Sequence, residues 1–296
     1  MAAAGRRPGA RGHPATGHPR GTVPRHGGPG GRGRPRRRAE ERVKAAAIAR
    51  NTFREATRDR ALTGVLVAGV ALILATQALG ALALGEESRL TVDLGLSAIS
   101  GFGLLVIVLV GTSLVAKEIE RRTIFNLLSR PIGRPAYLLG KWLGLSSALW
   151  VVVAVLGLVV WLMLEVRGHG GYGPAVAEAA YLAGLELTVV TGLAVLFSAL
   201  STPVLSTLYT VGFYCAGQWS WDLRDFAERA PGALGVTLRV AADLVPNLPI
   251  FNMRALAAHG QVTTPFHLGL ATLYALVYCG CVLALAAAAF ESRDFK

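Results

Sequence analysis

Long uninterrupted apolar runs limit what this sequence can fold into more than any other feature. Of its 296 residues, 53% are hydrophobic and 16% are charged. A soluble globular domain carries roughly 25% charged residues, and here the charges are missing from extended stretches. Several of these stretches approach the ~20 residues that a helix needs to cross a bilayer. The sequence therefore predicts an all-α, polytopic membrane protein.

Charged or Pro/Gly-rich segments separate the apolar runs and define six predicted transmembrane helices. These are Ala61–Leu84, Leu94–Ala116, Tyr137–Val166, Ala175–Leu200, Val204–Ser220 and Phe266–Phe290. Pro135 suits the first turn of the third helix, where a backbone N–H has no intrahelical partner. A longer amphipathic stretch, Trp221–Pro265, precedes the last helix. Together, residues 61–296 are expected to form one transmembrane domain.

The net charge of +12 is confined to the N-terminal part of the chain. Residues 1–60 hold 16 Lys and Arg against 4 Asp and Glu, so the remainder is neutral. Residues 1–42 form a basic tail rich in Gly, Pro and Arg, which predicts disorder. Such a tail could bind nucleic acid, but no aromatic stacking platform or base-reading motif accompanies it. A start codon assigned too early would also explain the tail.

Residues 43–60 predict an amphipathic helix that lies in the membrane interface. Arg50, Arg54 and Arg58 recur every four residues and share one helix face. Phe53 adds an apolar anchor. Basic residues facing phosphates and an apolar face in the acyl region are typical of interfacial helices.

The distribution of basic residues predicts the orientation of the chain in the cell (inner or cytoplasmic) membrane. Lys and Arg concentrate in residues 1–60 and between the second and third predicted helices. The positive-inside rule then places both termini in the cytoplasm. The stretch Trp221–Pro265 falls outside although it holds four Arg; its four acidic residues balance them, and long loops obey the rule weakly.

The segment between the second and third predicted helices, residues 117–134, is the most informative part of the sequence. Glu118 and Arg122 are spaced to form an i,i+4 pair. Phe125 and Leu128 then form an apolar tip that nothing nearby in the chain would cover. Exposed apolar residues rimmed by charge are typical of protein contacts. The alternative is a helix that lies on the membrane surface.

Four stretches of sequence resemble ABC-2 type transporter permeases. They are IARNTFREATRDR before the first predicted helix, VDLGLSAISGFG through EIERRTIFNLLSRPIGR, LFSALSTP, and PNLPIFNMR before the last helix. The chain is most similar to the six-span subgroup that includes the permease of nitrous-oxide-reductase maturation (NosY-like). The resemblance covers about residues 43–296 and leaves the basic tail outside.

The resemblance implies how such a chain would work. In that family the loop between the second and third helices docks in a groove of an ATP-binding subunit, and residues 43–60 form an interfacial elbow. The residues that would couple to the ATPase are Glu118, Arg121, Arg122, Thr123, Phe125, Leu128, Ser129 and Arg134. The working unit would pair two ATPase subunits with a permease homodimer or heterodimer, and would export its substrate.

The sequence motifs favour a transporter subunit over an enzyme. The only Gly-Lys pair, Gly140–Lys141, is followed by Trp142 and not by Ser or Thr, so it is not a P-loop. ATP and Mg²⁺ are therefore expected on the partner ATPase, and no cofactor is expected on this chain. HExxH and GxSxG motifs are absent from the sequence, which disfavours an intramembrane enzyme. A secondary transporter stays open as an alternative.

Two polar residues inside the apolar runs are candidates for a translocation pathway, because polar groups at membrane depth are costly. Glu186 lies in the fourth predicted helix and Gln77 in the first. For Glu186, a structural hydrogen bond across a helix interface is the competing interpretation. Glu165 and Glu178 lie nearer the outer boundary and are expected to be solvated. The His and Cys residues show no metal-ligand spacing.

Overall fold

Helices make up all the regular structure in the described part of the chain. The computed structural model describes residues 33–80, 86–111 and 134–292. Its longer helices are α1 (Gly33–Arg58), α2 (Arg60–Gly80), α3 (Glu87–Val106), α6 (Arg134–Val166), α7 (Gly173–Leu200), α8 (Pro203–Gln218), α9 (Ser220–Arg229), α10 (Gly232–Leu244) and α12 (Pro265–Ser292). Its shorter elements are the π-helix η1 (Ile107–Gly111), the 3₁₀ helices η2 (Gly170–Tyr172) and η3 (Leu248–Phe251), and α11 (Arg254–Ala258).

Among the described residues, four helical segments are long and apolar enough to cross a membrane by themselves. They are Glu87–Gly111, Pro135–Val166, Gly170–Leu200 and Pro265–Ala289. Two bent helix pairs, Val43–Arg58 with Arg60–Thr76 and Leu234–Leu244 with Leu248–Ala258, raise the number to six if each pair is one span. The predicted all-α, multi-pass membrane architecture is confirmed.

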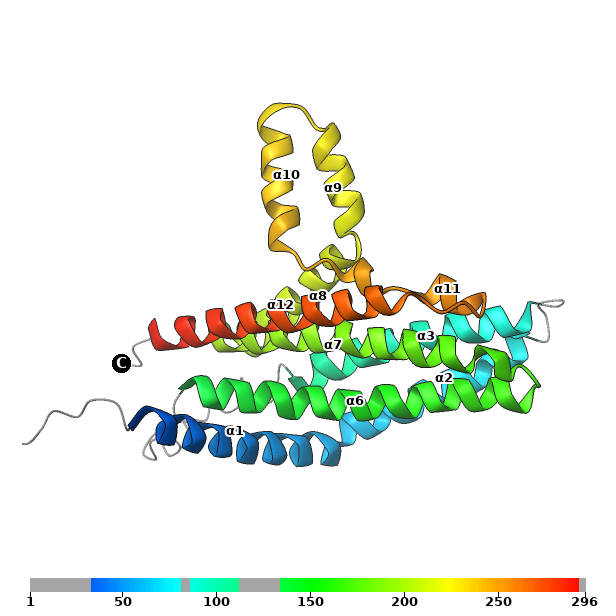
Figure 1. Ribbon diagram of the computed structural model, residues 1–296, viewed down its shortest axis with the longest axis horizontal. Helices are drawn as coiled ribbons and strands as arrows, with labels where there is room; N and C mark the ends of the chain where they lie inside the picture. The colour runs from blue at the N-terminus through cyan, green and yellow to red at the C-terminus, as the bar shows by residue number, and fades with distance from the viewer. Residues whose placement is uncertain (1–32, 81–85, 112–133, 293–296) are drawn as a thin grey trace, which may run out of the picture.

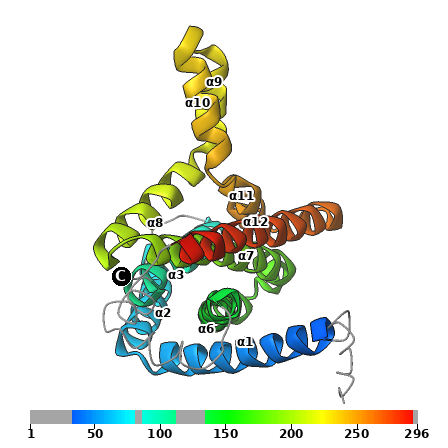
Figure 2. The same ribbon diagram turned by 90° about the vertical axis from the view of Figure 1, so that its left-hand side faces the viewer.

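Helix α7 lies at the centre of the bundle. In its apolar window, 83% of the residues are buried within the chain, against 33% for α12. It packs against α3, α6, α8 and α12, and Figure 2 shows it enclosed between α6, α3 and α12. The residues that face lipid therefore lie mainly on the outer helices, whereas α7 is lined by protein on most sides.

Most predicted helix boundaries lie within a few residues of those observed, but two starts differ. Helix α3 begins at Glu87, seven residues before the predicted Leu94, because its first turns are held to the bundle. Thr91 and Val92 are buried there, and Glu87 forms an ion pair with Arg167. Helix α1 begins at Gly33, inside the predicted tail. The Ala, Arg and Glu residues that follow Pro35 favour helix, which accounts for the earlier start.

The N-terminal helix α1 packs directly against the first turns of α6. A side chain at Gly140 would come within 2.8 Å of the Ala45 carbonyl oxygen, and one at Gly144 within 2.6 Å of that of Ala49. Two glycines four residues apart therefore let the two helix backbones approach closely, as small residues do at helix interfaces in membranes. Figure 2 shows α1 crossing beneath α6.

Helix α8 is shorter than the fifth span predicted for this region. Its 16 residues extend about 24 Å, less than the ~30 Å hydrocarbon core. The chain then turns at Trp219 into the α9–α10 hairpin, which projects sideways from the bundle (Figure 1). The two hairpin helices pack mainly against each other. The region predicted as one amphipathic loop is thus two helices followed by η3 and α11.

Candidate functional site

The buried carboxylate of Glu186 is the centre of the candidate site. Glu186 lies midway along α7, and 2% of its surface is exposed. Its Oε1 accepts a hydrogen bond from Gln218 Nε2, at the last residue of α8. An α-helical residue so deep in an apolar bundle places its side chain against neighbouring helices, and here it reaches the end of α8.

A guanidinium group lies close to the same carboxylate. Arg254, the first residue of α11, interacts electrostatically with Glu186. Its Nη1 also donates a hydrogen bond to Ser97 Oγ on α3, over 3.3 Å. Tyr214 of α8 and Ser100 of α3 place their hydroxyl groups next to the carboxylate. These residues form what we call the polar cluster: Ser97, Ser100, Glu186, Tyr214, Gln218 and Arg254.

The polar cluster offsets the free-energy cost of placing a carboxylate inside an apolar bundle. An unpaired charge there would cost several kcal/mol, whereas a paired and hydrogen-bonded one is tolerated. Arg254 supplies the opposite charge and Gln218 supplies a donor. The buried Ser100 hydroxyl has no hydrogen-bond partner of good geometry among the described residues. The Ser100 hydroxyl could therefore form a further hydrogen bond beside the carboxylate.

The cluster also fastens the base of the α9–α10 hairpin to the bundle. Gln218 immediately precedes the hairpin, and Arg254 follows it after η3. Between them, the Asn247 backbone N–H donates to the Tyr274 hydroxyl of α12 over 2.8 Å. Ser220 Oγ donates to Asn247 Oδ1 over 3.3 Å. Both ends of the segment 219–253 are thus held at the same place.

Of the site residues predicted from the sequence, only Glu186 has a side chain within the described part of the chain. Glu186 is buried in the bundle and hydrogen-bonded. Gln77 belongs to α2, but its side chain is outside the described part of the chain. The side chain of Arg134, the first residue of α6, is outside it too. The other predicted coupling residues lie in 112–133, also outside the described residues: Glu118, Arg121, Arg122, Thr123, Phe125, Leu128 and Ser129.

Sequence reasoning missed every partner of Glu186. Arg254 lies in the stretch expected to be an external loop, yet it is only partly exposed and faces the carboxylate. No local sequence signal links the two residues, because they are 68 positions apart. Glu178 was expected to be solvated, but its Oε2 accepts a hydrogen bond from the Thr263 N–H and its Oε1 is buried. That expectation is corrected: the carboxylate joins α7 to the turn before α12.

Comparison with known proteins supplies the family. The model of the ABC-2 family transporter proteins matches residues 46–295, which include nearly all the described helices. A comparison with curated proteins gave no match. The matched range begins within α1, as the resemblance in the elbow sequence predicts, and ends within the last residues of the chain. The chain therefore belongs to the ABC-2 transporter family.

Proposed function

We propose that this chain is the membrane-spanning permease of an ABC exporter and that a separate subunit supplies ATP hydrolysis. The family match over residues 46–295 carries the proposal, and the long apolar helices support it. The chain would belong to the six-span NosY-like subgroup. It would lie in the cytoplasmic membrane with both termini in the cytoplasm. ATP and Mg²⁺ would be bound by the partner ATPase, and two permease chains, identical or related, would complete the transporter.

The proposed coupling element is the segment 117–134, which would dock in the ATPase. Helix α6 starts at the end of this segment, and Gly140 and Gly144 hold its first turns against α1. Lys141, of which 3% is exposed, also places Nζ 4.0 Å from Glu55 Oε2 of α1. A displacement of the docked loop would therefore move α1 and α6 together.

The polar cluster is the proposed translocation element of this chain. A hollow of about 430 Å³ lies between α2 and α3 and is lined by Thr76 and Ser97 among apolar residues. Ser97 also binds Arg254, so the hollow adjoins the cluster around Glu186. Gln77 follows Thr76 on α2. A polar solute that entered this hollow would reach Ser97 and, through it, the other groups of the polar cluster around Glu186.

The coupling proposal is tested by replacing Phe125 with Asp in the full chain, co-expressed with an ABC ATPase from the same genome neighbourhood. A buried aromatic anchor contributes about 2 kcal/mol or more at an interface, so the ATPase affinity is expected to fall roughly thirtyfold. Co-purification and ATPase stimulation measure this loss. Deletion of residues 124–128 is expected to do the same.

The matched control is Phe226→Asp on the projecting hairpin, which changes an equally large and largely exposed side chain. It should leave ATPase association unchanged. Normal association and transport in Phe125→Asp would contradict the coupling assignment. Transport that continues without any ATPase would instead support the secondary-transporter alternative.

A further inference from the structure

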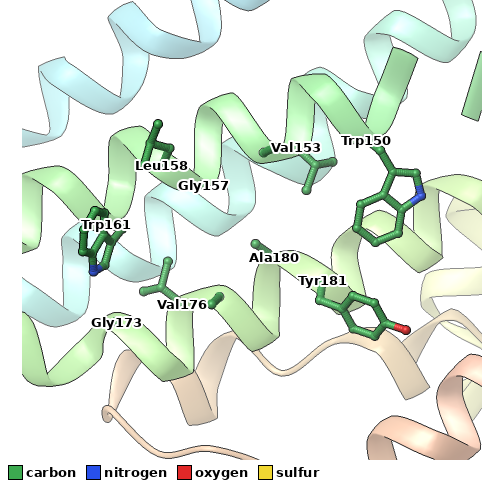
Figure 3. Close-up of a pocket in the computed structure, with 11 residues that line it drawn as sticks. Trp150, Val153, Gly157, Leu158, Trp161, Gly173, Val176, Ala180 and Tyr181 are labelled. Atoms are coloured by element: carbon green, nitrogen blue, oxygen red, sulfur yellow. The ribbon is translucent and has the colours of Figure 1, made fainter. Parts of the chain in front are cut away.

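A long apolar groove follows the contact between α6 and α7, away from the polar cluster. It is open along one side and has a volume of about 380 Å³. Figure 3 shows Trp150 and Trp161 of α6 at its two ends and Tyr181 of α7 beside Trp150. Its floor consists of small residues: a side chain at Gly157 would meet the Ala180 methyl group at 3.4 Å. The two helices therefore touch along the floor, and the groove lies over their contact.

Hydrogen bonding and ring packing fix the positions of the aromatic side chains Trp150, Trp161 and Tyr181 at the groove. The Tyr181 hydroxyl forms a 2.9 Å hydrogen bond with Thr272 Oγ1 of α12, and the Trp150 and Tyr181 rings are 5.7 Å apart. Trp150 also packs over Gly184, where a side chain would collide with its ring. At the other end, Trp161 Nε1 lies beside Gly173. The groove is thus a preformed feature and not a gap between loose side chains.

The groove has the depth of one membrane leaflet. Trp150 and Trp161 are eleven residues apart on α6, which is about 16 Å along the helix axis. One leaflet of a ~30 Å hydrocarbon core is about 15 Å deep. Trp161 lies five residues before the end of α6 at Val166, where an interfacial tryptophan is expected. With Trp161 placed at the interface, the groove extends from the α6–α7 turn to about the middle of the bilayer.

We propose that this groove binds one acyl chain of a bilayer phospholipid, at a defined site. Dividing 380 Å³ by a length of about 16 Å gives a mean cross-section of about 24 Å². That accommodates a single extended hydrocarbon chain and is much too narrow for a helix about 10 Å across. Leu158 and Leu162, which are exposed beside the groove, are apolar, so we expect its opening to face lipid. The site does not depend on the proposed transport function.

Photolabelling tests the site in the full chain in nanodiscs of phosphatidylcholine that carries a diazirine on one acyl chain. Labelling mapped by mass spectrometry is expected to be several-fold higher on 154–161 and 176–181 than on the exposed face of α12 around Leu273 and Leu276. The variant Ala154→Leu/Ala177→Leu fills the groove from two exposed positions that line it. Its labelling of these segments should fall several-fold.

The control is Ala284→Leu/Ala288→Leu, which adds the same volume at two exposed positions of α12 outside the groove. It should leave labelling of the groove unchanged, and all variants should elute from size-exclusion chromatography like the parent chain. Labelling that follows exposure alone, or that persists in the filled groove, overturns the proposal. Labelling that disappears as protein copies associate would place a second copy there and would also overturn it.

Discussion

Two helix junctions in this membrane protein, α1–α6 and the base of the α9–α10 hairpin, are stabilised by different interactions. At the α1–α6 junction, Gly140 and Gly144 bring two backbones into contact, beside the ion pair of Lys141 and Glu55. At the base of the α9–α10 hairpin, hydrogen bonds and charges around Glu186 join α3, α7, α8 and α11. We expect added volume to disrupt the first junction and the loss of a hydrogen-bonding or charged partner to disrupt the second.

The largest effect is expected for Gly144→Leu. Its Cβ would lie 2.6 Å from the Ala49 carbonyl oxygen, and a backbone atom cannot move aside as a flexible side chain can. Forcing the helices apart should lower the free energy of unfolding by about 3 kcal/mol. Thermal unfolding in detergent measures the change. Gly280→Leu on α12, where a side chain meets open space, is the matched control; equal losses in the two variants would show that the junction is not close-packed.

A smaller loss is expected for Glu186→Leu. The substitution adds no heavy atom but leaves Gln218 and Arg254 without their acceptor. Because Arg254 is only half-buried, the loss should be about 2 kcal/mol and not the full cost of a deeply buried unpaired charge. The same unfolding assay applies. Glu186→Gln keeps an acceptor for Gln218 and should retain part of the stability; if it is as damaging as Leu, charge alone holds the junction.

The smallest effect is expected for Arg229→Ala on the hairpin. Arg229 and Asp225 form an ion pair with side chains 80% and 70% exposed, and such pairs contribute about 0.3 kcal/mol. The unfolding free energy should hardly change, and added salt should not distinguish the variant from its parent. A loss comparable with that of Glu186→Leu would mean that the hairpin is buried in the assembled protein and that its ion pair contributes as much as the polar cluster.

The sequence alone predicts the close-packed part of this molecule better than the polar part. The ends of α6, α7 and α12 follow from apolar runs bounded by Pro135, by the glycines of residues 168–173 and by Pro265, because these signals are local. Glu186 is recognisable because it is a single carboxylate deep inside an apolar run. Its partners are not, since Arg254 is 68 residues away in a segment whose charges resemble those of a solvated loop.

The α9–α10 hairpin likewise could not be predicted from local sequence signals. Residues 221–244 alternate charged and apolar residues, which is equally typical of an external loop and of two short helices. Gly235 makes a tertiary contact in this hairpin, because it lies against the carbonyl oxygens of Ala227 in α9 and of Ala230 in the turn that follows. No spacing rule within one helix reveals such a contact.

The shortness of α8 has a consequence for the membrane itself. A helix of about 24 Å that starts at one surface ends several Å below the other, and Asp222 and Arg224 follow within six residues. Charged side chains at that depth draw headgroups and water towards them. The bilayer adapts to such hydrophobic mismatch by thinning. We therefore expect a local dimple in the membrane on the α8 side of the protein, with lipid of ordinary thickness beside α6.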